Sequence, residues 1–245
     1  MLPYTNRLKD GRIHWGGHDY QVRLVPGQSY GLHGFGHRQA WQVDESNESH
    51  VAMSWRHTAD DVEWPWSFTA RLVYALSDDG LEMDVMIRNE SSTSMPAILG
   101  WHPYVPAFWL TAANASGMAC AVHALDDDGA CVADMGLVRP IRIVTDDQTP
   151  HTVALQDWRS NWSIQTLAGE RWCLTANVAH LVHHVPKELT YACIEPVSAL
   201  PGSLGLTSSQ RVPNEMGLAP ATWRRLKCRL EATDLGKHQK TISSP

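Results

Sequence analysis

The sequence has no apolar run of the roughly 18 or more residues that a membrane-spanning helix needs. Residues 1–7 also contain no apolar stretch of the kind that secretory signal peptides carry. The five cysteines are scattered and odd in number, and no two of them form a C-x-x-C pair. Such a set is typical of reduced thiols and not of a disulfide framework. These absences predict a cytoplasmic protein with no membrane partner.

The chain also lacks an excess of positive charge. Its formal net charge is −6 and its pI is near 6.1. A mildly acidic surface does not attract the phosphates of nucleic acids or of anionic lipids. We therefore expect no nucleic-acid partner, and the sequence leaves the oligomeric state open.

A sustained helical period of apolar residues is lacking as well, whereas alternation with period two is common. The clearest case covers residues 66–88, where apolar residues alternate from Trp66 to Leu76 and again from Leu81 to Ile87. Asp78-Asp79-Gly80 lies between the two runs and offers turn residues, with Gly80 free to adopt a positive φ. This pattern predicts a β-hairpin with one buried face.

Shorter alternations occur along the rest of the chain, at residues 20–24, 51–55, 172–178 and 226–230. Many short strands separated by Gly, Pro, Asn and Asp favour an all-β sandwich or barrel. A chain of 245 residues of this class commonly forms one domain. We predict a single domain over residues 1–233, followed by a loose polar tail over residues 234–245.

Candidate chemistry gathers in four segments where His, Arg or Glu stands beside Gly or Pro. Such positions tend to present side chains at strand ends or in loops on a rigid scaffold. The segments are Pro3-Tyr4-Thr5-Asn6-Arg7 with the downstream Gly11-Arg12, Leu32-His33-Gly34-Phe35, Gly100-Trp101-His102-Pro103-Tyr104, and Cys193-Ile194-Glu195-Pro196-Val197.

These segments resemble, in the same order, the motifs of the aldose 1-epimerase (galactose mutarotase) family. The resemblance covers residues 3 to about 202, with Arg38 and Trp41 following the second motif as in the family. It implies a galactose-mutarotase-like β-sandwich and an isomerase that interconverts the α and β anomers of a free hexose. That reaction needs no metal and no cofactor, and the sugar would be the small-molecule partner.

The resemblance also implies roles for individual residues. Glu195 would be the base that takes the proton from the C1 hydroxyl, and His102 the acid that protonates the ring oxygen. An imidazole titrates near neutral pH and can serve in either direction. We expect the two groups to face each other across one cleft, a hexopyranose apart. Sugar-binding roles fall on Arg7 and His33, and with them on Asn6, Arg38 and Trp101.

Each of these residues also has a plain structural interpretation. Glu195 could be a surface carboxylate, His102 a histidine packed among aromatic residues, and His33 a turn residue. The histidines at 180, 183 and 184 and the acidic run 126–128 lack the patterns of zinc and calcium sites, so we predict no metal.

Two features depart from the family pattern. The Asn-Arg motif begins almost at Met1, so the domain either lacks the family's first strands or belongs to a longer reading frame. Lost strands would leave a sheet edge unpaired. The family's sugar-binding Asp would align with Gln156, and Asp157 lies one residue away. Because a slip of one residue moves a side chain to the other face of a sheet, either residue could fill that position.

Two other functions remain open at this stage. A hexose-6-phosphate 1-epimerase would need a cationic cluster for the phosphate, which Arg7, Arg12 and Arg38 could supply. A non-catalytic sugar-binding module on the same scaffold is the second alternative, because a fold does not determine a function.

Overall fold

The computed structural model describes residues 1–59, 63–106, 114–116, 121–125, 131–134, 142–144, 151–156, 158, 162–165, 171–188, 190–205 and 216–233. Nearly all regular structure in these ranges is β-strand, which confirms the predicted all-β fold. The helical elements among these residues are two 3₁₀ turns, η1 (Gly36–Arg38) and η2 (Ser203–Gly205). No helix in the described part of the chain has the length and apolar character to cross a membrane. The predicted tail 234–245 lies outside the described residues.

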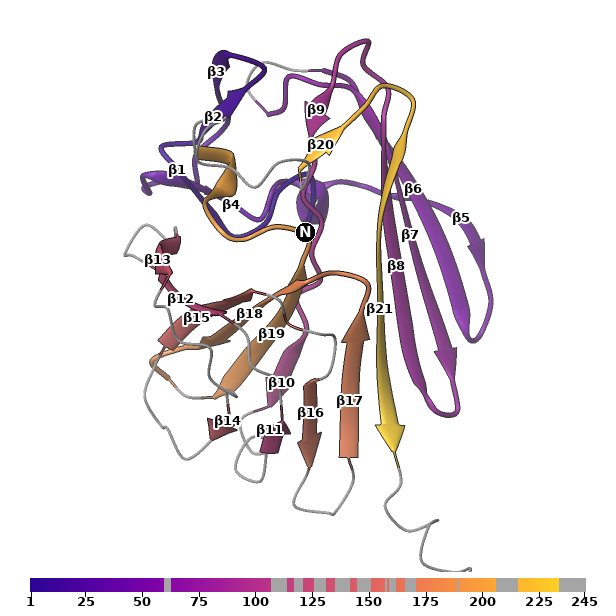
Figure 1. Ribbon diagram of the computed structural model, residues 1–245. Coiled ribbons are helices and arrows are strands. Elements are labelled where there is room, and N and C mark those ends of the chain that lie inside the picture. Colours follow the sequence, from indigo (N-terminus) through magenta and orange to yellow (C-terminus); the bar gives the residue numbers. More distant parts are fainter. Residues whose placement is uncertain are drawn as a thin grey trace, which may run out of the picture.

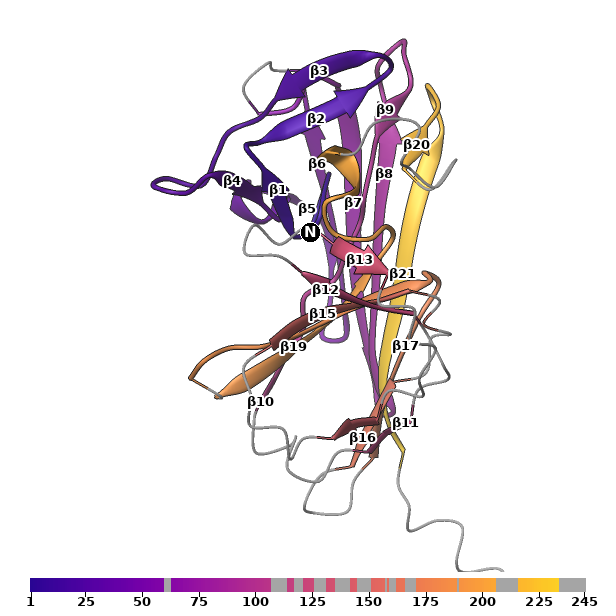
Figure 2. The same ribbon diagram turned by 60° about the vertical axis from the view of Figure 1, so that its left-hand side comes forward.

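Two large sheets form the body of the molecule (Figure 1). The first has seven strands in the order β16 (Trp162–Gln165), β17 (Arg171–Ala176), β21 (Trp223–Thr233), β8 (Gly80–Asn89), β7 (Phe68–Ser77), β6 (His50–His57), β5 (Gln42–Ser46). The second has six strands in the order β10 (Tyr104–Pro106), β19 (Tyr191–Val197), β18 (His180–Val185), β15 (His151–Gln156), β12 (Ala121–Leu125), β13 (Cys131–Asp134). Figure 2 shows the strands of the second sheet running obliquely to β8 and β21.

Short two-stranded sheets complete the fold. They pair β1 (Arg7–Lys9) with β4 (Tyr30–Leu32), β2 (Arg12–Trp15) with β3 (His18–Gln21), β9 (Met95–Pro96) with β20 (Gly217–Leu218), and β11 (Asn114–Ser116) with β14 (Arg142–Val144). The first residues of the chain lie between β1–β4 and the six-stranded sheet (Figure 1). This position brings the Asn-Arg motif into the middle of the molecule.

The predicted hairpin is formed by β7 and β8, whose pairing closes at Ser77 and Gly80. Its inward face is buried at Phe68, Ala70, Met83, Val85 and Ile87, as the alternation predicts, whereas Leu76 at the end of the hairpin is 58% exposed. The prediction for Gly80 was wrong, because its φ does not lie in the positive region. A Cβ there would instead lie 2.2 Å from the carbonyl oxygen of Leu230, so glycine is needed where the backbone of β21 passes close by.

The two sheets share one apolar core. Met83, Val85 and Leu226 enter it from the seven-stranded sheet, and Leu181 and Ile194 enter it from the six-stranded sheet. Sheets that bury one face each against the other form a sandwich, which is the predicted architecture.

The opposite face of the six-stranded sheet carries a second, smaller apolar cluster of Ala154, Val182 and Val197. The register places Glu195 opposite Val182, and Val182 opposite Ala154. Directly paired residues point to the same side of a sheet. Glu195 therefore projects away from the main core and over this small apolar cluster.

Candidate active site

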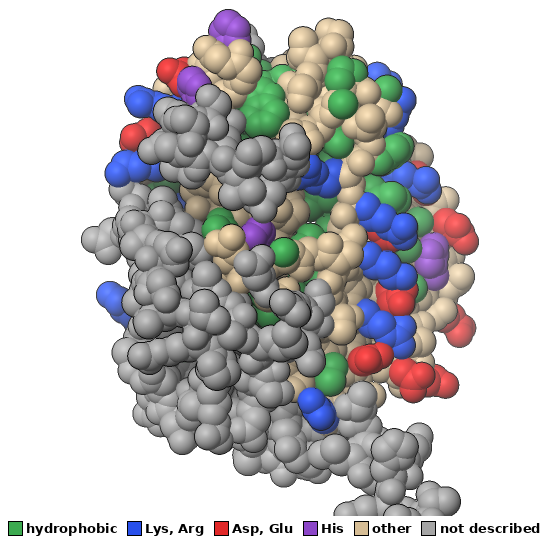
Figure 3. All heavy atoms as spheres, in the orientation of Figure 1, with side chains coloured by type: hydrophobic (Ala, Val, Ile, Leu, Met, Phe, Trp, Pro, Cys, Tyr) green, Lys and Arg blue, Asp and Glu red, His purple; other side chains and the backbone are tan. Residues whose placement is uncertain are grey.

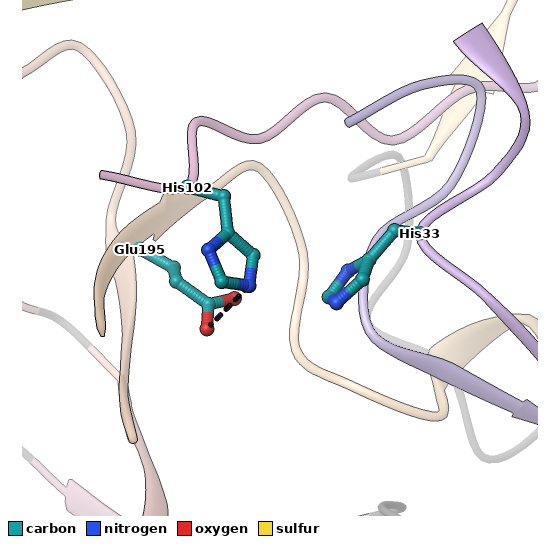
Figure 4. A group of neighbouring side chains, drawn as sticks. All are labelled: His33, His102 and Glu195. Carbon is teal, nitrogen blue, oxygen red and sulfur yellow. Dashed lines mark ion pairs between the residues drawn. The ribbon is translucent and has the colours of Figure 1, made fainter. Parts of the chain in front are cut away.

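Backbone pairing brings His102 and Glu195 together. The segment before β10 continues alongside β19, and the amide of Trp101 donates to the carbonyl of Pro196 at 3.1 Å. This arrangement sets residue 102 across from residue 195. The His102 Nε2 atom lies 3.3 Å from Glu195 Oε1 (Figure 4).

This separation is shorter than expected, because a hexopyranose was predicted to lie between the two groups. The chemistry accounts for the difference. In the reaction that the resemblance implies, the C1 hydroxyl and the ring oxygen are bonded to the same carbon, so groups that served them would have to be neighbours.

Asn6 and His33 approach from the N-terminal strands. The His33 amide donates to the Asn6 carbonyl at 3.0 Å, and the Asn6 amide donates to His33 Nδ1 at 3.1 Å. The Asn6 side chain donates from Nδ2 to Glu195 Oε2, also at 3.1 Å. Asn6 and His33 both have left-handed φ angles, +54° and +57°. Asn and His adopt this region more readily than most residues.

The His33 ring points toward His102 and Glu195 (Figure 4). Its centroid lies 4.9 Å from that of His102, with the two rings perpendicular. Because Nδ1 accepts a hydrogen bond from a backbone amide, the proton of the neutral ring lies on Nε2. His33 is thus a hydrogen-bond donor toward any ligand at Nε2.

The ligand atoms of His33, His102 and Glu195 all lie within 4.8 Å of one another, a spacing that a metal ion could bridge. A metal needs an unprotonated nitrogen from each histidine. The Asn6 backbone amide donates a hydrogen bond to Nδ1 of His33, so the proton of the neutral ring lies on Nε2. The three groups therefore suit a ligand that accepts hydrogen bonds better than a metal ion.

Burial controls the protonation of the site. Glu195 is only 2% exposed, and burial raises the pKa of its carboxyl to about 8, against the lowering effect of the Asn6 hydrogen bond. Burial lowers the pKa of His102 to about 4. Burial, followed by the proximity of His102, lowers the pKa of His33 to about 3. The raised pKa of Glu195 and the lowered pKa of His102 together favour a neutral pair in which the two groups hold one proton between them.

Comparison with known proteins assigns the chain to one family. The profile of the aldose 1-epimerase family matches residues 1–134, more than half of the chain. The chain belongs to the aldose 1-epimerase family.

Individual relatives are distant. The uncharacterized protein YphB of Escherichia coli K12 is 25% identical over 107 residues, which cover 43% of this chain and only 36% of that relative. A candidate aldose 1-epimerase from Escherichia coli K12 superimposes with a TM-score of 0.78 at 18% identity, over 96% of this chain and 82% of that one. A galactose mutarotase-like protein from Clostridium acetobutylicum superimposes with a TM-score of 0.76 at 17% identity, over 94% of this chain and 78% of that one. Galactose 1-epimerase from Lactobacillus acidophilus superimposes with a TM-score of 0.72 at 13% identity, over 94% of this chain and 78% of that one. These structures confirm the galactose-mutarotase-like β-sandwich.

Two of the arginines suggested by the family resemblance lie in different surroundings. Arg7 is half-buried, with its guanidinium carbon 4.7 Å from the ring centroid of Tyr30. Arg38 lies in η1 with 44% of its side chain exposed, 3.7 Å from the carboxylate of Glu63. Glu63 also pairs with Arg23 at 2.7 Å. The contacts of Arg38 are therefore with an ion-pair group, and its role in binding sugar stays a prediction.

The side chains of Trp101 and Gln156, both predicted to bind sugar, point to opposite sides of the six-stranded sheet. Trp101 packs against the main core and hydrogen-bonds with the Tyr74 side chain. Gln156 ends β15 opposite His180, which in turn lies opposite Val197. Because Val197 and Glu195 are two residues apart on β19, Gln156 lies on the Glu195 face of the sheet. Asp157 lies outside the described residues, so Gln156 is the member of this pair that the structure places.

Tyr104 is a contact of the candidate acid that the sequence reasoning did not assign to the site. Its ring stacks on His102 with centroids 5.0 Å apart and an interplanar angle of 27°, and 63% of the residue is exposed. The signal was present, since Tyr104 belongs to the same Gly-Trp-His-Pro-Tyr segment. Tyr104 limits access to one side of the imidazole.

Proposed function

We propose that this chain is an aldose 1-epimerase that interconverts the anomers of a free hexose without a cofactor. The observation that carries the proposal is the contact between the buried Glu195 and the half-buried His102. A pair that holds one proton has what the reaction needs, which is one group that accepts a proton and one that donates it.

The proposed cycle conserves that proton. In the reactive form Glu195 is a carboxylate and His102 an imidazolium. Glu195 takes the proton of the C1 hydroxyl, C1 forms a carbonyl, the C1–O5 bond breaks, and His102 protonates O5. After rotation about C1–C2, O5 attacks the other face of C1, His102 takes its proton back, and Glu195 returns a proton to the oxygen on C1.

Neighbouring residues would support these steps. The Nε2 proton of His33 and the guanidinium of Arg7 are donors for sugar oxygens, and a guanidinium stays charged throughout. The apolar surroundings of Glu195 make the neutral pair the resting form. In the neutral pair Glu195 is protonated and His102 is not, which is also the state that the proposed cycle reaches when the sugar ring is open.

Polarimetry on fresh α-D-glucose and α-D-galactose tests the proposal. Glu195→Gln keeps the shape of the side chain and removes the base, so we expect the catalysed rate to fall by about 10²–10⁴-fold. Glu82→Gln is the matched control, since Glu82 lies on the outer face of the seven-stranded sheet and should leave the rate unchanged.

Other outcomes select the alternatives. An unchanged rate in Glu195→Gln would remove Glu195 from the mechanism. Sugar binding in calorimetry without any catalysed mutarotation would favour a binding module. A strong preference for hexose 6-phosphate would favour the phosphate-specific enzyme, although the contact of Arg38 with Glu63 gives that function less support.

A further inference from the structure

Asn6 contacts two groups of the candidate site at once. Its side-chain amide donates to Glu195 Oε2, and its backbone amide donates to His33 Nδ1. The residue is 7% exposed and its φ is +54°. A buried left-handed residue with three hydrogen bonds to two site residues is strongly constrained, because most side chains disfavour that backbone region.

The side-chain contact fixes the direction of the carboxylate. Glu195 Oε2 is held by Asn6 while Oε1 faces His102 at 3.3 Å. With both oxygens engaged, the carboxyl group cannot rotate without breaking one contact. The oxygen that exchanges a proton with the substrate is thus kept beside the imidazole.

The backbone contact fixes the proton of His33. Since the Asn6 amide has only a donor to offer, Nδ1 must be the acceptor and Nε2 must carry the hydrogen. This contact uses the main chain, so it survives replacement of the Asn6 side chain. The two contacts can therefore be separated by mutation.

We propose that Asn6 is a positioning residue that aims Glu195 at His102 and keeps His33 a donor, so that it controls turnover more than sugar affinity. This role rests on the proposed function and differs from the sugar-lining role that the family resemblance implies. It also gives a reason for asparagine: the residue supplies a neutral donor to a carboxylate and tolerates the left-handed backbone.

Asn6→Asp separates the two roles. The Oδ1 atom of Asn6 is buried and accepts no hydrogen bond from the residues that the structure describes, so a change that keeps this oxygen breaks no contact there. Aspartate keeps an oxygen at that position and removes the donor to Glu195. It also adds negative charge beside Glu195, which raises the pKa of the Glu195 carboxyl further.

For Asn6→Asp we expect kcat for mutarotation to fall by about 10- to 100-fold, the range typical of residues that orient a functional side chain. KM should stay close to the parent value for both glucose and galactose. The alkaline limb of the pH–rate profile should move to higher pH. Asn177→Asp is the matched control, since Asn177 bonds only to the backbone of β21 among the described residues and should change none of these quantities.

Asn6→Gly covers the case in which two adjacent carboxylates prevent folding. Glycine keeps the left-handed backbone and the amide that holds His33, so we again expect a fall in kcat. A loss confined to KM in either variant, or an Asn6→Asp profile with an unmoved alkaline limb, would overturn the positioning role.

A direct titration distinguishes failure of this inference from failure of the proposed function. If the parent shows no mutarotation at all, the proposed function fails, but the Glu195 carboxyl can still be followed by carbon-13 NMR. Asn6→Asp should then raise the midpoint of that titration. An unchanged midpoint would refute the contact itself.

Discussion

Glu82 and Glu195 show how differently one residue type is used in two regions of this protein. Glu82 lies on the outer face of the seven-stranded sheet, 3.1 Å from Lys227 and 2.9 Å from Arg229. Figure 3 shows this face with positive and negative side chains interspersed. Hydrogen bonds from Lys227 and then Arg229 lower the pKa of Glu82, whereas burial raises that of Glu195 to about 8.

The difference lies in the solvent that each carboxyl group sees. At the outer face, water and two cations stabilise the charge, so Glu82 stays ionised and adds little to stability. In the site, water is replaced by an apolar cluster and a neutral imidazole. A carboxyl group whose pKa lies near the working pH can gain and lose a proton during a reaction.

The largest expected effect is on the pH dependence of the rate. In the proposed cycle, the pair works while it holds one proton. A second proton on His102 below about pH 4 and loss of the last proton near pH 8 should both stop the cycle. We expect a bell-shaped profile of kcat/KM whose limbs change about tenfold per pH unit. Initial polarimetric rates, corrected for uncatalysed mutarotation, measure it. A rate that stays constant from neutral pH to about pH 10 would contradict the shared proton.

The second effect concerns stability. A raised folded-state pKa means that the contribution of Glu195 is fully present below its unfolded pKa and is lost as the pH rises through about 8. Glu195→Gln carries no such charge, so its free energy of unfolding should exceed that of the parent at alkaline pH by on the order of a few kcal/mol. His33, His102 and the Met1 ammonium titrate in both proteins, so the difference reports mainly on residue 195.

Denaturant unfolding at about pH 6.5 and pH 9 measures this change. Glu82→Gln provides the contrast. Because the pKa of Glu82 is lowered in the folded state, its contribution to stability is present above the unfolded pKa and is lost only as the pH falls into the acid range. The difference in free energy of unfolding between Glu82→Gln and the parent should therefore be the same at both pH values. A Glu195→Gln difference that does not grow with pH would refute the buried-carboxyl description.

The sequence was most informative where local pattern and local structure coincide. Alternation predicted the β7–β8 hairpin and the strand at residues 226–230, which is part of β21, because one residue in two faces the core. The candidate site was predicted by motif resemblance, which named His102 and Glu195 but placed them a hexopyranose apart instead of 3.3 Å apart. That distance depends on a pairing between residues 93 positions apart in the chain, which no local pattern encodes. The dual contact of Asn6 and the stacking of Tyr104 on His102 depend on tertiary packing in the same way.

The smallest effect compares two glycines, one beside the site and one in an outer hairpin. Both have left-handed φ angles, +65° for Gly34 and +59° for Gly16, so alanine at either position should cost about 1 kcal/mol from the backbone alone. A Cβ on Gly34 would also lie 2.0 Å from the carbonyl oxygen of Leu2, while a Cβ on Gly16 would have no neighbour within 4 Å. Gly34→Ala should therefore lose about 1–3 kcal/mol more in denaturant unfolding. It should also slow mutarotation, since pushing Leu2 away disturbs the chain that leads to Asn6 and His33. Equal losses of stability in the two variants would mean that residues 1–6 shift at little cost in free energy. Asn6, which lies in that segment, could then not fix the direction of the Glu195 carboxylate.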